Sequence, residues 1–198
     1  MKRLFPAPML LAPALFALAA CVQTPAPQAP PESAATAPVP KLPGRVIWTD
    51  GHAPVAVAQA GQADCQPTSA EQAARGLAAT NATRHEAGLA PLVGNRKLDR
   101  VAADHACDMA QRGLMTHTGS ATAGPMARAR ALGYRPRIIA ENIAAGRFEI
   151  DGTLAQWSAS PKHRANITIP ELQEFGLGMA TAADGKTTFW AAVYAKKM

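Results

Sequence analysis

The pattern of apolar and polar residues predicts two consecutive helices in the middle of the chain. Thr68-Ser69-Ala70-Glu71 has the spacing of a capping box with Thr68 as the N-cap, and an alanine-rich helix follows to about Ala87 and ends at Gly88. A second helix is predicted from about Arg96 to Gly113, because apolar positions recur there at helical spacing. This apolar stripe consists of Leu98, Val101, Ala102, His105 and Met109.

Two further helices are predicted to be short. One covers Pro125 to Gly133, and the other covers Thr153 to Ala159 and ends at Ser160-Pro161, since a residue that precedes proline disfavours the helical region. Upstream of all four helices, Val46-Ile47-Trp48 and Val55-Ala56-Val57 are candidate short strands, or an arm that lies on the domain.

The C-terminal part of the chain predicts a β-hairpin. Phe175 to Ala180 and Thr187 to Tyr194 are rich in strand-forming residues, and Asp184-Gly185 between them is a strong hairpin signal. Because helices come first and a hairpin last, the predicted fold class is α+β with a largely antiparallel sheet.

The first residues resemble the signal peptide of a bacterial lipoprotein. Lys2 and Arg3 precede a mostly apolar run that is too short and too interrupted by proline for a membrane span. The run stops at Leu18-Ala19-Ala20-Cys21, which resembles the lipobox, in which the cysteine thiol is acylated and becomes the first residue of the mature protein. We therefore expect residues 1–20 to be a lipoprotein signal peptide and Cys21 to be lipidated. The alternative is an ordinary secretory signal.

Composition divides the rest of the chain into a tether, an arm and a domain. Residues 21–43 contain seven prolines and cannot bury enough apolar surface to fold, so we expect a tether that follows the acylated cysteine. Residues 44–67 form an N-terminal arm, and residues 68–198 form the folded domain. Val22 in place of an aspartate favours the outer membrane, facing the periplasm, in a Gram-negative cell. The net charge of +6 does not indicate nucleic-acid binding, because the basic residues are not interleaved with aromatic ones.

Two cysteines remain after Cys21. Cys107 lies on the polar face of its predicted helix with Arg100 and Asp104, and an exposed thiol in an exported protein favours pairing, for which Cys65 is available. A Cys65–Cys107 disulfide would contribute about 4 kcal/mol in the chain-entropy model. Two free thiols are the alternative.

Candidate chemistry centres on two of the five histidines. His117 and His163 occur in polar segments crowded with small residues, and Glu141-Asn142 stands between them inside an apolar run, where burial requires hydrogen-bond partners. His105, on the apolar stripe, favours a satisfied core role. The remaining histidines are His85, expected to be solvated, and His52, in the arm.

Several motifs together resemble the bacterial branch of the CAP superfamily, the cysteine-rich secretory, antigen 5 and pathogenesis-related (SCP-like) proteins. The resemblance covers about Thr68 to Tyr194 and implies a three-layer α-β-α sandwich with a cleft on one side. It is carried by Asn81-Ala82-Thr83-Arg84, Ala87-Gly88-Leu89-Ala90-Pro91-Leu92, Thr116-His117-Thr118, Glu141-Asn142-Ile143-Ala144, Ser160-Pro161-Lys162-His163-Arg164-Ala165-Asn166-Ile167 and Phe175-Gly176-Leu177-Gly178.

The resemblance implies a polar site in the cleft. In the family, two histidines and two glutamates converge there, and some members hold a divalent ion such as zinc. His117, Glu141 and His163 match three of these positions, whereas Gly152 occupies the position of the second glutamate. The neighbouring acids, Asp151 and Glu149, are out of register with that position.

Three functions follow from the resemblance as hypotheses. Since family members are associated with sterol, lipid or glycan binding, the first is an envelope-anchored binding module with a candidate zinc site at His117 and His163. The second is a metal-assisted hydrolase or peptidase that uses Glu141 as its base. The third is a structural envelope protein in which His117, Glu141 and His163 form only a hydrogen-bonded network.

A basic segment adds an electrostatic feature. From His117 to Ala140 no acidic residue occurs. If this segment rims the cleft, it would attract anionic groups such as lipid head groups or acidic cell-wall polymers. A solvated surface is the alternative. The basic residues concerned are Arg128, Arg130, Arg135 and Arg137.

Overall fold

The computed structural model describes residues 46–198. The expected signal peptide, the lipidated Cys21 and the tether lie outside the described residues, as do the first two residues of the arm. Within the described part, no helix combines the length and the apolar character that a membrane span requires.

A mixed five-stranded sheet forms the centre of the domain, in the order β1-β5-β7-β6-β3. The three central strands pair antiparallel, whereas the short outer strands β1 and β3 run parallel to β5 and β6. The strands are β1 (Val46–Thr49), β3 (Val93–Gly94), β5 (Pro136–Gly146), β6 (Glu174–Thr181) and β7 (Thr188–Lys197). A separate pair joins β2 (Val55–Ala56) to β4 (Leu114–Met115), so the arm does lie on the domain.

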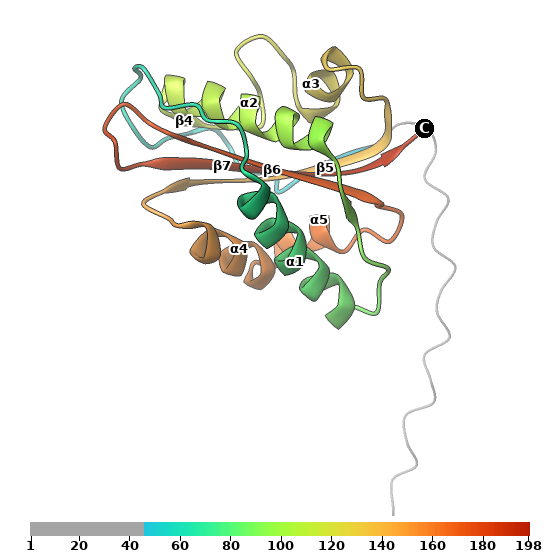
Figure 1. Cartoon of the computed structure of the whole chain (residues 1–198). Helices are drawn as coiled ribbons and strands as arrows, with labels where there is room; N and C mark the ends of the chain where they lie inside the picture. Colours follow the sequence, from blue (N-terminus) through green and yellow to red (C-terminus); the bar gives the residue numbers. More distant parts are fainter. Residues whose placement is uncertain (1–45) are drawn as a thin grey trace, which may run out of the picture. The chain divides into compact units, whose positions relative to one another are not determined.

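Helices cover both faces of the sheet (Figure 1). One face packs against α2 (Arg96–Arg112) and α3 (Pro125–Ala131). The other face packs against α1 (Ala70–Glu86), α4 (Ile150–Ala159) and α5 (Pro161–Ile167). Along β7, alternate residues contribute to the two apolar cores, because side chains alternate across a strand. The predicted three-layer α-β-α sandwich is confirmed.

The two long helices begin and end close to their predicted limits, with one shift. The N-cap of α1 is Ser69 and not Thr68: the Ser69 hydroxyl accepts from the Gln72 amide at 3.1 Å, and the Gln72 side chain accepts from the Ser69 amide at 3.0 Å. Thr68 instead donates to the carbonyl of Leu177 at 2.6 Å. Helix α2 ends at Gly113, whose φ of 64° is favourable only for glycine.

Close packing of α2 on the sheet depends on two glycines of β6. A Cβ atom placed on Gly176 would overlap backbone atoms of Leu98, and one placed on Gly178 would overlap those of Ala103. The helix backbone therefore rests directly on the strand, and this approach sets the position of the whole α2 layer.

Several predicted limits were wrong. The strand β5 was not predicted, α4 begins three residues before Thr153, and Pro161 starts the separate helix α5 rather than only ending α4. The hairpin link spans Ala182 to Thr187 and is longer than the two-residue turn that Asp184-Gly185 indicates. One carboxylate oxygen of Asp184 accepts hydrogen bonds from the backbone amides of Lys186 and Thr187, and these bonds order the link.

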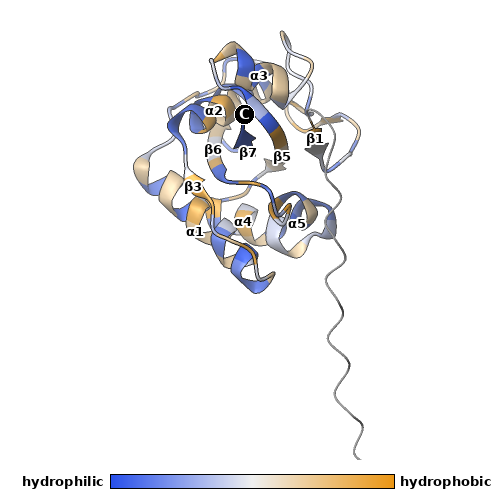
Figure 2. Cartoon of the chain, turned by 90° about the vertical axis from the view of Figure 1, so that its right-hand side faces the viewer, coloured by the Kyte–Doolittle hydropathy of each residue, from blue (hydrophilic) through white to orange (hydrophobic). Residues whose placement is uncertain are grey.

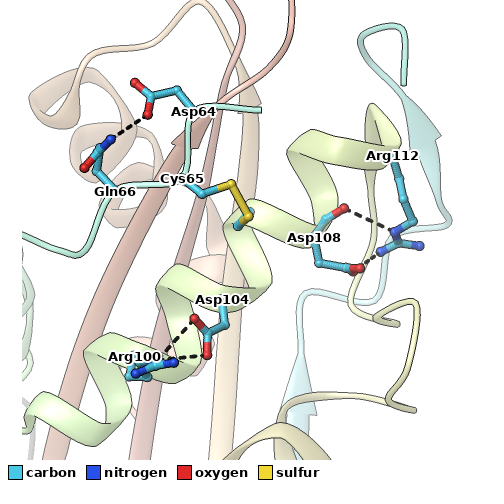
Figure 3. The surroundings of a disulfide bond; sticks show 8 residues. Asp64, Cys65, Gln66, Arg100, Asp104, Asp108 and Arg112 are labelled. Atoms are coloured by element: carbon cyan, nitrogen blue, oxygen red, sulfur yellow. Dashed lines mark hydrogen bonds and ion pairs between the residues drawn. A yellow bond between two sulfur atoms is a disulfide. The ribbon is translucent and has the colours of Figure 1, made fainter. Parts of the chain in front are cut away.

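The predicted disulfide between Cys65 and Cys107 is confirmed, with 5.3 Å between the two Cα atoms. It ties the segment before α1 to the exposed face of α2 (Figure 3). On that face, Arg100 pairs with Asp104 and Arg112 pairs with Asp108, each one helical turn apart. The bond therefore fixes the arm against the helix that packs on β6.

Candidate functional site

Four separate segments of the chain meet beside the middle of β5. Because β1 runs parallel to β5 with Thr49 opposite Glu141, the next residue, Asp50, is carried to the side of Glu141. His117 follows β4, and His163 lies on α5. The structure therefore brings the three residues expected from the sequence to one place, together with an unexpected residue of the arm.

Asp50 is the centre of the site and joins the two predicted histidines. His117 Nε2 donates to one carboxylate oxygen of Asp50 at 2.9 Å, and His163 Nε2 donates to the other at 3.0 Å. Only 5% of Asp50 is exposed. Burial raises the pKa of Asp50, but the hydrogen bonds from His117 and His163 outweigh burial and hold the pKa well below its usual range. Asp50 is therefore a carboxylate near neutral pH.

His117 is held between two carboxylates. Its Nδ1 atom lies 2.9 Å from a carboxylate oxygen of Glu141, opposite the contact of Nε2 with Asp50. Burial lowers the pKa of His117, but the hydrogen bonds to Asp50 and Glu141 raise it by more than burial lowers it. The result is a pKa of about 9. Both ring nitrogens therefore carry a proton near neutral pH in the absence of a metal.

Glu141 is completely buried and ion-paired. Arg128 Nη2 lies 2.5 Å from its second carboxylate oxygen, and His105 Nε2 lies 3.7 Å from the first. Burial raises the pKa of Glu141, but the surrounding His105, Arg128 and His117 lower it more. The Glu141 carboxylate is thus ionised, and both of its oxygens have a partner, His117 for one and Arg128 for the other.

Arg128 does not form part of an exposed rim, so this prediction was wrong. It is 8% exposed and, besides Glu141, its Nη1 donates to the carbonyl of His117 at 3.0 Å. The burial of Glu141 needs a buried cation, which draws this arginine inward. In contrast, Arg130, Arg135 and Arg137 are exposed.

Amide side chains position the helix that carries His163. Asn142 donates to the carbonyl of His163 at 3.1 Å, and Asn166 donates to the Asn142 side chain at 2.8 Å and to the Glu141 carbonyl at 3.2 Å. The requirement that a buried Asn142 be paired is satisfied. These bonds fix α5 on β5, so that His163 faces Asp50.

His52 is the second site residue that the sequence reasoning missed. Its ring lies 5.5 Å from that of His117, and its Nδ1 atom lies 3.6 Å from Asp50. Both ring nitrogens are buried without a hydrogen-bond partner among the described residues. The only local signal was an acid and a histidine two positions apart, directly after the candidate strand that ends near Thr49.

The donor set at this point fits a divalent metal. Asp50, His52 and His117 each offer one ligand atom, and these three atoms lie within 4.8 Å of one another. Imidazole nitrogens with a carboxylate oxygen are typical zinc ligands, and His52, whose ring nitrogens have no hydrogen-bond partner within residues 46–198, can supply one of them. This set differs from the predicted pair of His117 and His163, since His163 reaches the group only through Asp50.

The position of the family's second glutamate does not contribute to the site. Gly152 is exposed, and no atom of the described residues lies within 4 Å of its Cβ position. Asp151 pairs with Arg75 of α1, and Glu149 is exposed at the N-cap of α4. The second carboxylate of the site comes instead from Asp50.

His105 lies in the core as predicted, but its hydrogen-bonding capacity is not satisfied within the described residues. Neither ring nitrogen has a hydrogen-bond partner among the described residues. Burial lowers its pKa to about 4, against the opposing effect of Glu141, so the ring is neutral near pH 7. His105 and Arg128 also line a cavity of about 220 Å³, whose other walls include Val101, Ala121 and Leu132.

Comparisons with known proteins agree with this architecture. A family model described as "Cysteine-rich secretory protein family" (CAP) matches residues 77–194. The "Uncharacterized protein YkwD" of Bacillus subtilis (strain 168) is 29% identical over 99 residues, which cover 50% of this chain and 38% of that protein. The match thus spans well under half the length of that relative.

Two solved structures share the fold. An outer surface protein from Borrelia burgdorferi has a TM-score of 0.57 at 20% identity, with 66% of this chain and 96% of that chain covered. An extracellular protein containing a SCP domain from Bacillus anthracis str. Ames has a TM-score of 0.55 at 22% identity, with 67% and 45% covered. At these identities the likeness concerns the fold alone.

Proposed function

The chain belongs to the cysteine-rich secretory protein (CAP) family, and from this premise we propose that it is an envelope-anchored binding protein with a divalent-metal site. The ligands of the metal are Asp50, His52 and His117. The observation that carries the proposal is the pair of buried ring nitrogens of His52, which have no hydrogen-bond partner in the described part of the chain and lie next to a carboxylate and a second imidazole. A bound zinc ion would give one of these nitrogens the partner that it lacks among the described residues.

Distances within the group support this assignment. Asp50 Oδ1 lies 2.9 Å from His117 Nε2 and 3.6 Å from His52 Nδ1. These two separations bracket the value of about 3.3 Å expected between donors of a tetrahedral zinc at bond lengths of about 2.0–2.1 Å. Since His163 donates to the far oxygen of Asp50, it orients the carboxylate ligand from behind.

Protons compete with the metal at this site. His117 must lose a proton before it can ligate, and its raised pKa of about 9 opposes that loss. Zinc affinity is therefore expected to rise as the pH is raised from 6 to 9, and each bound ion should release a proton.

The geometry favours binding over hydrolysis. A zinc ion with three protein ligands can polarise a bound water or ligand. However, Glu141 is sealed from solvent, and both of its oxygens are already paired with Arg128 and His117. A general base must be able to take a proton from that water, and this carboxylate is held in its ionised form by its partners.

The cavity beside Glu141 suits a small ligand. Its volume of about 220 Å³ is below the range of about 300–1,000 Å³ typical of sites for drug-sized molecules. Its lining combines apolar residues such as Val101, Ala121 and Leu132 with polar and charged ones. The polar and charged residues are Asp104, His105, Asp108, Ser120, Thr122 and Arg128. By its volume, this cavity therefore favours a small molecule over a whole sterol or an oligosaccharide among the expected ligands.

Export and anchoring complete the proposal. The lipobox-like sequence that ends at Cys21 supports a lipid anchor, and two proteins of similar fold are titled outer surface and extracellular proteins. We propose that the protein is held on the outer membrane, facing the periplasm, when its cell is Gram-negative. Substitution of Cys21 by alanine should release it from membranes that are washed with about 0.5 M salt, which screens exposed charges, and retention after that wash would refute the anchor.

Zinc titration by calorimetry at pH 8 tests the metal site. His52→Gln should weaken binding at least tenfold, whereas His85→Gln, which changes an exposed histidine at the end of α1, should leave binding unchanged. His163→Gln should have a smaller effect than His52→Gln, because His163 acts through Asp50. Equal affinity of the wild type and His52→Gln would refute the site and leave the hydrogen-bonded network as a structural lock between arm and domain.

A further inference from the structure

Six basic side chains gather at one end of the sheet, here called the basic end. Strand β5 begins there with Pro136 opposite Lys197 of β7, and the amide of Met198 donates to the Arg135 carbonyl at 3.1 Å. The start of α2 adjoins this end, since the Lys97 ammonium lies 3.8 Å from the Cβ position of Gly133. The basic end consists of Lys97, Arg130, Arg135, Arg137, Lys196 and Lys197.

Local backbone structure displays these charges to solvent. A register shift between Pro136 and Ile138 leaves Arg137 as an extra residue in β5, and such bulges turn a side chain out of the ladder. Five of the six side chains are exposed, and Lys196 is half-buried. Figure 2 looks onto this end, where the end of β7 is coloured hydrophilic.

The charges of the basic end are not neutralised within the described part of the chain. None of the six residues has a carboxylate oxygen within 4.0 Å in that part. Glu174, which lies at this end opposite Ala195, accepts hydrogen bonds from Asn95 and Tyr134. Even when Glu171, three residues earlier in the chain, and the backbone carboxylate of Met198 are added, three acidic groups face six basic residues, so the end carries a net positive charge.

The polypeptide joins the domain at the same end. Val46, the first residue of β1, lies opposite Ile138, which is also paired with Lys196. Cys21 is 25 positions before Val46, and that length of chain spans at most about 90 Å. A lipid on Cys21 would thus confine the basic end to the neighbourhood of a membrane surface.

We infer that the basic end is a docking surface for an anionic lipid bilayer, an inference that extends the proposed anchored function. Arginine binds phosphate through two parallel hydrogen bonds, and each basic residue near an anionic bilayer raises partitioning about fivefold. The anchor supplies proximity, and the basic end then fixes which side of the domain faces the lipid.

Docking in this orientation places the candidate metal site near the head groups. Glu141 is three residues along β5 from Ile138, a distance of about 10 Å at the rise of a strand. Asp50 lies beside Glu141 at the same level. A ligand taken from the bilayer surface would therefore have a short path to the site.

Vesicle co-sedimentation tests the docking surface independently of the anchor. The full chain with Cys21→Ala, which cannot be acylated, is mixed with vesicles of phosphatidylcholine alone or with 30% phosphatidylglycerol at low salt. The double variant Arg137→Gln/Lys197→Gln removes two charges from the basic end. The control Arg147→Gln/Lys186→Gln removes two exposed charges from the opposite end of the sheet, where Gly146 lies opposite Thr188.

We expect binding only to the anionic vesicles, a loss of at least fivefold for the basic-end variant, and less than twofold for the control. Raising the salt to about 0.5 M should abolish binding, since exposed charges are then screened. Equal losses for the two variants, or no binding to anionic vesicles, would overturn the inference. Binding to a soluble polyanion such as polyphosphate but not to vesicles would likewise refute the bilayer as partner. None of these outcomes bears on zinc binding or on retention through Cys21.

Discussion

The unusual environment of His117 makes the stability of the metal-free protein depend on pH above neutrality. The perturbation is deprotonation of an imidazole whose two nitrogens donate to Asp50 and Glu141. In the unfolded chain this histidine titrates near its ordinary pKa of 6.5, whereas in the fold its pKa is raised to about 9. A raised pKa contributes stability that is fully present below about pH 6.5 and is lost as the pH rises through about 9.

The magnitude follows from that difference. About 2.5 pKa units at about 1.36 kcal/mol each correspond to about 3 kcal/mol of unfolding free energy. The side chain of His117 is only 13% exposed, so solvent screening reduces this contribution little. Asp50→Asn replaces one of the two carboxylates beside His117 with a neutral amide. About half of the dependence of stability on pH between 6.5 and 9 should therefore disappear.

Urea unfolding in the presence of EDTA, at several pH values from 5.5 to 9.5, measures this contribution. Between pH 6.5 and pH 9, the unfolding free energy of the wild type should fall by about 3 kcal/mol more than that of His117→Gln. His85→Gln should follow the wild type, since it removes an exposed histidine. An NMR titration that places the pKa of His117 in the folded protein near 6.5 would contradict this expectation. A His117→Gln variant as pH-dependent as the wild type would refute it equally.

Three further predictions concern the framework of the site. Gly178→Ala should lower the free energy of unfolding by about 3 kcal/mol in urea, because its methyl group would meet the backbone of Ala103, while Gly152→Ala, with open space around it, should not destabilise. Arg128→Met should lower the free energy of unfolding by about 3–5 kcal/mol by leaving Glu141 buried without its guanidinium partner, and restoration of stability by a second change, Glu141→Gln, would confirm the pairing. Cys65→Ala/Cys107→Ala should lower stability by about 4 kcal/mol, as expected for a sequence separation of 42, and a thermal midpoint unchanged from the wild type would contradict this.

Local patterns in the sequence were sufficient for the elements that are exposed on one face. Helix α2 was predicted to within one residue, because its apolar stripe faces the sheet and its other face is solvated. Strand β5 was missed for the opposite reason. Both of its faces are covered, so it presents a nearly continuous apolar run without the alternation that marks a half-exposed strand. Strand β7 is covered on both faces too, but its strand-forming residues and the turn signal at Asp184-Gly185 identified it.

The candidate site likewise contains residues that sequence motifs identified and residues that only the fold brings in. The motifs around His117, Glu141 and His163 identified these residues through the family resemblance, and the structure brings all three together. Asp50 could not be assigned from the sequence, since it lies 67 residues from His117 and 113 from His163. Only the parallel register of β1 on β5 places it between them.

Local patterns and motifs in the sequence were thus enough to identify the family, the layers of the fold and three polar residues of the site. Cys65 and Cys107 were expected to pair, but two free thiols remained the alternative until the fold brought the two cysteines together. Tertiary structure alone decided that Asp50 and His52 of the arm complete the site and that Arg128 turns inward to Glu141. The physical reason is that a carboxylate or a guanidinium has the same chemistry at any position of a sequence. Its charge state, burial and role are set by the partner that long-range packing brings to it.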